Sequence, residues 1–400
     1  MIFVSGQIFV DPTNGGMLKG DIKEEGGLYQ AMNIEQVNTP AFLVDLSKVT
    51  RNTQRMFDRA RRLNVRLRPH VKTHKTAEVA RLQVGAGSAA ITVSTLAEAW
   101  FFQSAGFDDI TYAYPITPQK LPEAAELTRA MRHFHIVLDN PETFAAVHSY
   151  GRAHGIRFSA FIKVDCGYHR AGVDPEKAES ITLAKQLHDS EAVEFAGILT
   201  HAGHSYRCRN RSEILEVATQ ERAVMVRFAG LLEENGVACP TVSVGSTPTA
   251  VHAESWEGVS EIRPGNYVFF DKFQADIGSC SLDDCAATVL TRVIGHYPDR
   301  SQLIIDAGAL ALSKDPGAIH IHNTVIFGAV LGNPQLKIVS LSQEHGVVES
   351  EVPIPFEEHP IGNLLRIIPN HSCLAAALFP KYYVVEEENV VDEWSPVRGW

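Results

Sequence analysis

The sequence has 400 residues, 45% of them hydrophobic and 21% charged, which is ordinary for a soluble globular protein and enough for two substantial domains. Its formal net charge of −11 argues against a general nucleic-acid binder. No run reaches the roughly 18 apolar residues of a membrane span, and the N-terminus lacks the pattern of a signal peptide. Six cysteines are too few for a disulfide scaffold, so we expect a reducing, cytoplasmic location.

The first part of the chain, residues 1–38, is rich in glycine and irregular, and we treat it as an N-terminal extension. Residues 39–45 (TPAFLVD) predict a short strand that ends at an acidic residue. Residues 46–63 then carry the spacing of apolar residues that is typical of a helix.

A regular alternation of strands and helices follows. Apolar, β-branched runs occur at 66–72, 89–95, 109–114, 133–139, 158–165, 195–201, 241–247 and 260–263. Helical patterns occur at 76–86, 96–105, 119–130, 141–154, 175–188 and 211–235. Eight such runs indicate βα units that close into a (β/α)8 barrel over residues 39–268. An open doubly wound sheet is the alternative, but the chain has no Gly-rich dinucleotide fingerprint.

The alternation stops near residue 269. Strand-like runs at 287–296, 302–306, 325–331 and 337–341 follow, with turns between them and no long helices. We therefore predict a mainly β second domain over residues 269–400.

Lys72 stands at the end of the first predicted barrel strand, within RPHVKTHK. Functional residues of such barrels lie at the C-terminal ends of the strands. A lysine partly buried beside Arg68, His70 and His74 would have a lowered pKa, which Schiff-base chemistry requires. A solvated basic loop explains the same residues, and the local sequence leaves both interpretations open.

The last two predicted strands end in VSVGSTPT and IRPGNY, where barrels commonly hold a phosphate. Backbone amides and small hydroxyl side chains suit such a group. Gly-Ser-Thr is also an ordinary turn sequence, so its position carries most of this prediction.

His371 and Cys373 are two residues apart, and in an extended segment both side chains face the same side. Imidazole and thiolate together favour zinc, and a site with two protein ligands keeps positions open for water and substrate. A buried core pair is the alternative on these residues alone.

Taken in order, several motifs resemble those of one family over about residues 37–400. They are TPAFLVD, RPHVKTHKT, ITVSTLAEA, DCGYHRAGV, ILTHAGHSY, VSVGSTPT, EIRPGNYVFFD, SQEHG and IIPNHSC. The family is that of the fold-type III pyridoxal-phosphate (PLP) enzymes, which includes D-serine dehydratase, D-threo-3-hydroxyaspartate dehydratase and D-threonine aldolase. The match is closest to the dehydratase branch.

The resemblance implies an α/β protein with an alanine-racemase-like barrel and a β domain, assembled as a homodimer. It implies that Lys72 binds PLP covalently and is the catalytic residue. It further implies a cofactor pocket and a metal pair. The pocket residues are Tyr168, Tyr206, Gly245, Ser246, Thr247, Arg263, Gly265 and Asn266, with Arg263 facing the pyridine nitrogen; His371 and Cys373 bind zinc or another divalent metal.

The implied activity is dehydration of a D-3-hydroxy amino acid such as D-serine to a 2-oxo acid and ammonia. Retro-aldol cleavage of the D-threonine aldolase type is the alternative, and that branch has aspartate where this chain has Cys373. A PLP carrier on the same barrel is a third interpretation, but such proteins typically lack the β domain. The sequence leaves the preferred side chain of the substrate open.

Overall fold

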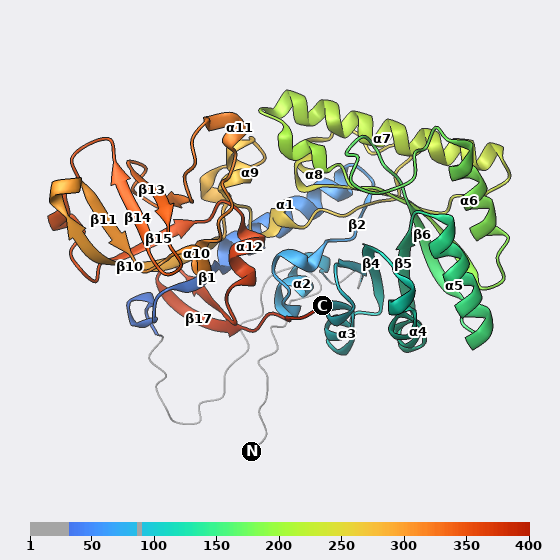
Figure 1. The fold of residues 1–400 in the computed structure, drawn as a ribbon, viewed down its shortest axis with the longest axis horizontal. Helices are drawn as coiled ribbons and strands as arrows, with labels where there is room; N and C mark the ends of the chain where they lie inside the picture. Colours follow the sequence, from blue (N-terminus) through green and yellow to red (C-terminus); the bar gives the residue numbers. More distant parts are fainter. Residues whose placement is uncertain (1–31, 86–89) are drawn as a thin grey trace, which may run out of the picture.

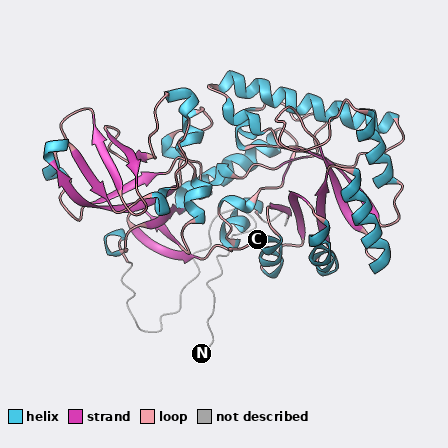
Figure 2. Ribbon diagram, viewed as in Figure 1, coloured by secondary structure: helices cyan, strands magenta, loops and turns pink. Residues whose placement is uncertain are grey.

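The computed structural model describes residues 32–85 and 90–400. It divides into a barrel of parallel strands wrapped by helices and a domain built mainly of antiparallel strands, which lie side by side (Figure 1, Figure 2). The predicted extension, residues 1–38, falls largely outside the described residues. Its described end forms a short 3-10 helix, η1 (Ile34–Gln36), beside the second domain.

Eight parallel strands form the barrel in the order β2-β9-β8-β7-β6-β5-β4-β3. A backbone hydrogen bond of 2.9 Å from Thr92 N to Pro69 O, with a parallel bridge between His70 and Thr92, joins the two ends. The predicted (β/α)8 barrel is therefore confirmed. The strands are β2 (Arg66–Leu67), β3 (Ala90–Val93), β4 (Asp109–Pro115), β5 (His133–Leu138), β6 (Phe158–Lys163), β7 (Val193–Leu199), β8 (Val242–Val244) and β9 (Glu261–Ile262).

Helices cover the outside of this barrel (Figure 2). Local signals set their ends: Asn140 caps the amide of Thr143, Pro141 occupies the first turn, and Gly155 ends the same helix with a left-handed φ of 63°. The helices are α1 (Leu46–Arg62), α2 (Ala77–Val84), α3 (Leu96–Ser104), α4 (Leu121–Ala130), α5 (Pro141–His154), α6 (Ala178–His188), α7 (Arg211–Glu234) and α8 (Thr247–His252).

The second domain is a nine-stranded sheet in the order β11-β14-β13-β12-β15-β10-β1-β16-β17, and a further pairing of β10 with β11 closes six of its strands into a small barrel. Its described helices are all short. The strands are β1 (Ala41–Asp45), β10 (Ala287–Tyr297), β11 (Gln302–Ile305), β12 (Ala329–Val330), β13 (Leu336–Leu341), β14 (Gly346–Ser350), β15 (Leu364–Ile368), β16 (Tyr382–Glu386) and β17 (Asn389–Trp394). The helices are α9 (Lys272–Asp276), α10 (Ala309–Leu312), α11 (Ile319–His322) and α12 (Ser372–Ala377).

The strand β1 corrects the expected boundary at residue 39. It pairs with β10 and β16, so it belongs to the β domain although it precedes the barrel in the sequence. Its residues are almost all buried, since a strand in the middle of a sheet needs apolar side chains on both faces. The chain thus begins in the β domain, enters the barrel through α1 and returns after β9.

A buried ion network ties the barrel together from the inside. Arg68, only 2% exposed, donates to Glu261 Oε2 at 2.9 Å and to Asp109 Oδ1 at 2.5 Å. These carboxylates stand at the starts of β9 and β4, so one guanidinium links three strands. Among the described residues, no helix is long and apolar enough to cross a membrane.

Candidate functional site

Lys72 lies at the mouth of the barrel, in the 3-10 helix η2 (Val71–Thr73). The strand β2 stops at Leu67, so Lys72 does not end that strand as predicted but follows it after a short extended stretch. The side chain is accessible to solvent although protein atoms surround it closely, which places it in an open cavity rather than on the outer surface.

Desolvation lowers the pKa of Lys72, and the positive charges of Arg170 and Arg263 act in the same direction. Two of the three groups named from the local sequence act elsewhere, whereas His70 accepts from the backbone N–H of Lys72 at 3.4 Å. Arg68 is engaged by carboxylates inside the barrel, and His74 is fully buried against Gln83. A lowered pKa increases the neutral amine that Schiff-base formation needs.

Two rings stand across the cavity from Lys72. His201 follows β7, and desolvation together with the charge of Lys72 holds its pKa well below the ordinary value. The ring of Tyr168 lies 6.2 Å from that of His201 and packs directly on Gly203. A Cβ atom at Gly203 would come within 2.2 Å of the Tyr168 ring, so only glycine fits there.

Tyr206 lies on the same side of the cavity, in the 3-10 helix η4 (Gly203–Arg207). Its ring is 6.3 Å from that of His201. Burial raises the pKa of its hydroxyl, and the nearby charges of Cys373 and Asp271 raise it further. The two predicted pocket tyrosines therefore converge on one histidine.

The segment after β8 was predicted to cradle a phosphate with its backbone amides. Gly245 does not serve in that way, because its N–H donates to buried Glu221 Oε1 at 2.9 Å. Its carbonyl instead accepts from His201 Nδ1 at 2.8 Å. A Cβ atom here would lie 2.8 Å from Arg263 N, and φ is +135°, so glycine is required for close packing.

Backbone amides without a hydrogen-bond acceptor occur shortly after Gly245 in the sequence. Ser246 caps α8, and its own N–H donates to Thr249 Oγ1. Within the described residues, the amides of Thr247, Gly265 and Asn266 have no protein acceptor. All three are buried, and Asn266 Oδ1 is also buried without a partner. The three free backbone amides, which are donors at the ends of the last two strands, fit a phosphate group.

Positive charge is concentrated in the mouth of the barrel. Arg263 is 6% exposed and donates to Ser243 Oγ and the carbonyl of Thr200, both neutral. Burial lowers the pKa of Lys163, at the end of β6, to about 8, and Arg263 and Arg170 contribute. This excess of cations fits an anionic cofactor and substrate.

His371 and Cys373 lie together, but not for the reason that the sequence suggested. His371 caps α12 and Cys373 belongs to its first turn, so the segment is not extended. The two side chains still interact: burial alone would raise the pKa of Cys373, but His371 outweighs it and lowers that pKa, and Cys373 in turn helps to raise the pKa of His371. Among the described residues no group of three or more His, Cys, Asp or Glu side chains could hold a metal.

Asp315 supports this pair and was missed from the sequence. Its Oδ2 lies 3.3 Å from His371 Nδ1, which leaves Nε2 of the imidazole for a metal. Burial alone would lower the pKa of His371, but Asp315 and Cys373 outweigh it and raise the pKa to about 11. Asp315 stands in an Asp-Pro-Gly turn of the β domain, which by itself predicts only a turn.

The candidate metal ligands lie beside the lysine loop. Cys373 Sγ lies 3.3 Å from Thr73 Oγ1, next to Lys72, and Asn266 Nδ2 approaches the same sulfur at 3.7 Å. Buried Asp271 holds the loop before α12 by accepting from Ser372 N at 3.0 Å. The two predicted groups of site residues thus form one site between the barrel and the β domain.

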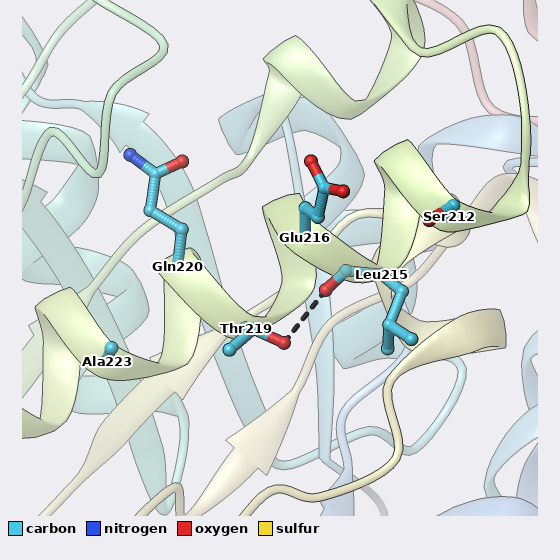
Figure 3. A pocket seen from close by; sticks show the side chains of 6 residues that line it. All are labelled: Ser212, Leu215, Glu216, Thr219, Gln220 and Ala223. Carbon is cyan, nitrogen blue, oxygen red and sulfur yellow. Dashed lines mark hydrogen bonds between the residues drawn. The ribbon is translucent and has the colours of Figure 1, made fainter.

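One surface hollow lies away from this site, and a second borders it at Asn370, the residue before His371. The first is lined by six side chains of a single face of α7, which point outward without converging on a common centre (Figure 3). The other, a cavity of about 430 Å³, lies beside α9 and α11 and reaches Asn370. Neither contains Lys72 or the metal pair.

Comparisons with known proteins agree with this arrangement. Residues 44–272 match the family model "Alanine racemase, N-terminal domain", and residues 286–385 match "Putative serine dehydratase domain". The chain is 39% identical to D-serine dehydratase of Dictyostelium discoideum, over 92% of this chain and 98% of that one. It is 38% identical to D-threo-3-hydroxyaspartate dehydratase of Delftia sp. (strain HT23), over 91% and 98%.

Solved structures extend the likeness to the fold. That Delftia dehydratase superposes with a TM-score of 0.88, covering 92% of this chain and 100% of that one, and a mutant has been solved in a metal-free form. D-threonine aldolase from Filomicrobium marinum, at 24% identity and a TM-score of 0.81, shares the fold. Barrel, β domain and lysine site together define a PLP-dependent lyase of the alanine-racemase fold. The chain belongs to the D-serine dehydratase family of these enzymes.

Proposed function

We propose that this protein is a PLP- and zinc-dependent dehydratase that converts a D-3-hydroxy amino acid, such as D-serine, to a 2-oxo acid and ammonia. The family supports lyase chemistry on D-amino acids. The contact between Cys373 and the loop of Lys72 carries the proposal, because it sets a metal pair beside the lysine that binds the cofactor.

The residues present fit PLP. Lys72 offers an amine of lowered pKa in an open cavity. The amides of Thr247, Gly265 and Asn266 offer phosphate donors, supported by the hydroxyl residues Ser246 and Thr247. Tyr168, Tyr206 and Arg263 would line the cofactor ring, and Gly245 lets β8 approach Arg263. When bound, PLP acidifies the α-proton of the substrate by delocalising negative charge.

Lys72 would first hold the cofactor and then act as a base. The Lys72 amine, when it is not joined to the cofactor, would be free to take the α-proton of the substrate. Desolvation and the nearby arginines favour the neutral amine that this step requires.

His371 and Cys373 fit zinc in donor type, and Asp315 would orient the imidazole. Zinc held there supplies a Lewis acid for the departing β-hydroxyl, which is a poor leaving group. Two protein ligands leave coordination positions for the substrate. Zinc would then act on the β-hydroxyl and Lys72 on the α-proton of the same substrate, so the reaction would be an elimination.

The test is a substrate panel with product identification. Purified protein is first examined for the absorption of lysine-bound PLP and for its zinc content. D-serine, D-threonine and D-threo-3-hydroxyaspartate are then supplied separately, and 2-oxo acid, ammonia, glycine and aldehyde are measured. We expect 2-oxo acid and ammonia in equal amounts. Glycine and aldehyde alone would assign the protein to the aldolase branch, and no turnover with bound PLP would favour a carrier.

We also propose that the protein works as a homodimer in the cytoplasm. The family resemblance supports the dimer, and six free thiols suit a reducing compartment. Sedimentation of the PLP-loaded protein would test the first statement, since a monomer at micromolar concentration would contradict it. Cell fractionation would test the second.

A further inference from the structure

The last six residues of the sequence, 395–400, run from the β domain onto the barrel, and we call them the tail. Figure 1 shows the chain leaving β17 and passing to the side of the barrel that carries α2 and α3. Pro396 is buried, and a Cβ atom at Gly399 would touch Ala97 in α3 at 3.9 Å. The tail is therefore packed against two domains.

One contact of the tail holds the lysine loop. Val397 N donates to Lys75 O at 2.8 Å, three residues after Lys72. Lys75 is fixed from its other side as well, because its ammonium lies 2.9 Å from the buried carboxylate of Glu98. Lys75, at the end of the loop that carries Lys72, is thus bound by both the tail and α3.

A second contact holds the helix of the metal pair. Arg398 Nη2 donates to Ala376 O at 2.8 Å and also to Phe379 O. The carbonyl of Ala376 lies in the last turn of α12 and also accepts from Phe379 N at 3.3 Å and from the Tyr382 hydroxyl at 3.4 Å, whereas that of Phe379 lies just beyond the helix. The opposite end of the same helix carries His371 and Cys373.

The two contacts act on the two halves of one site. Cys373 meets Thr73 at the inner side of the lysine loop, and the tail joins Lys75 to the far end of α12 from the outer side. Because α12 is only six residues long, its C-terminal end lies close to its first turn, which Asp271 also holds. The distance between the metal pair and Lys72 therefore depends on where the tail holds α12.

We propose that the tail sets the position of the metal pair relative to Lys72, with Arg398 as its positioning residue. This inference rests on the proposed function, because it concerns the same site. Arg398 touches neither the cofactor nor the metal pair directly; it acts through the carbonyls of α12. If the tail only stabilised the fold, its removal would lower the free energy of unfolding but leave zinc affinity, PLP affinity, kcat and KM unchanged.

The experiment compares Arg398→Ala and Arg398→Lys with the wild-type holoenzyme. Zinc affinity is measured by competition with a chromophoric chelator, and kcat and KM are measured separately. Loss of a residue that supports a metal ligand typically costs about 10-fold to 100-fold in affinity, and we expect about the lower end here. We also expect kcat to fall more than KM, the PLP spectrum to persist, and Arg398→Lys to recover part of the loss.

Lys381→Ala is the matched control. It removes a basic side chain from the neighbouring hairpin, where Lys381 pairs with exposed Glu393 at 2.9 Å and lies over the ring of Tyr383. We expect it to keep wild-type zinc affinity and kinetics. An equal loss in this variant would mean that any disturbance of the hairpin has the effect, and would overturn the role of Arg398.

A chain that ends at Trp394 removes both contacts and provides the second test. We expect a loss of zinc affinity at least as large as that of Arg398→Ala, together with faster release of PLP. Wild-type zinc affinity and kcat in a folded Arg398→Ala variant refute the proposal, whether or not the shortened chain folds. If the wild type binds no zinc, the zinc dependence in the proposed function is wrong. In that case, a rate of PLP release from the shortened chain equal to that of the wild type refutes the role of the tail.

Discussion

Cys373 and Thr73 stand 300 positions apart in the sequence, yet their sulfur and hydroxyl oxygen lie 3.3 Å apart in the structure. Thr73 follows Lys72 directly, so this contact joins the β domain to the lysine loop of the barrel. Chemistry that needs both Lys72 and a metal can occur only where the two domains meet.

The first prediction concerns which lysine binds the cofactor. We expect borohydride reduction of the PLP-loaded protein, followed by peptide mapping, to place the label on Lys72. Lys75 is a poor candidate because its ammonium pairs with buried Glu98. Lys163 also has a lowered pKa, but it is 5% exposed inside the barrel, whereas Lys72 is accessible. A label on either of these two lysines would refute the assignment.

The second prediction tests the close packing of Tyr168. In Gly203→Ala the new methyl group would fall within 2.2 Å of the Tyr168 ring and displace it from His201. We expect weaker PLP binding, and overpacking of this kind typically costs about 1–3 kcal/mol of stability. Gly230→Ala is the matched control, because nothing lies within 4 Å of its added Cβ in α7. PLP titration and urea denaturation of both variants decide, and equal PLP affinity in the two would contradict the packing argument.

The third prediction concerns Asp315. Asp315→Asn removes the charge beside His371 Nδ1 but keeps the size of the side chain, so the imidazole loses its orienting partner. We expect zinc affinity to fall by about tenfold or more, with the PLP spectrum unchanged. Asp299→Asn, on an exposed turn of the same domain, is the control. Identical zinc titrations for both variants would remove Asp315 from the site.

Most of the barrel and its strand-end residues could be predicted from the sequence, because strand and helix periods differ and strand ends share one face. The location of β1 could not, since its pairing with β10 and β16 depends on residues more than 240 positions away. Asp315 was missed for a similar reason, because only the fold brings its turn to His371.

Gly245 and the metal pair show a different limit. A sequence motif predicts which residues lie close together, but not which of their atoms are already hydrogen-bonded within the protein. The amide of Gly245 donates to Glu221, in the middle of α7, and is therefore not available to a ligand. The neighbourhood of His371 and Cys373 was predicted from an extended segment, yet a helix N-terminus also brings these two side chains together.

The fourth prediction concerns acid stability. Burial alone would raise the pKa of Glu261, but Arg68 and Arg66 outweigh it and lower it to about 2 from an ordinary value of 4.5. A carboxyl whose folded pKa is depressed stabilises the fold above its unfolded pKa and loses that contribution as the pH falls toward the folded value. We expect stability to decline between about pH 4.5 and pH 2 for this reason.

Glu261→Gln isolates this contribution. It leaves the Arg68 guanidinium buried with one charged partner fewer, and breaking such a pair typically costs about 3–5 kcal/mol. Arg152→Ala is the control, because Arg152 is 64% exposed and pairs with Glu191, which is 69% exposed, and such pairs contribute about 1 kcal/mol or less. Urea denaturation at neutral and acidic pH measures both. If Glu261→Gln lost as much stability between neutral and acidic pH as the wild type does, Glu261 would not be the source of the acid sensitivity.

The last prediction separates the metal from the cofactor. We expect chelation to stop formation of 2-oxo acid from D-serine while PLP stays bound. The cofactor residues lie on the barrel between Lys72 and Asn266, whereas His371 and Cys373 lie on α12 of the β domain. Bound PLP is followed by absorbance during the titration, and product by a coupled assay. Restoration of turnover by added zinc completes the test.

Variants of Cys373 sharpen the same prediction. Cys373→Ala removes the thiolate, a strong zinc ligand, so zinc affinity should fall steeply while the lysine-bound PLP spectrum remains. Cys373→Asp supplies a harder oxygen ligand, which suits manganese better, and we expect manganese to restore more turnover in it than zinc does. Elimination needs an acid at the β-oxygen because hydroxide leaves poorly, and a metal held by His371 and Cys373 would supply one. Full activity in rigorously metal-free wild-type protein would therefore mean that another acid protonates the hydroxyl, and the metal role assigned to His371 and Cys373 would be wrong.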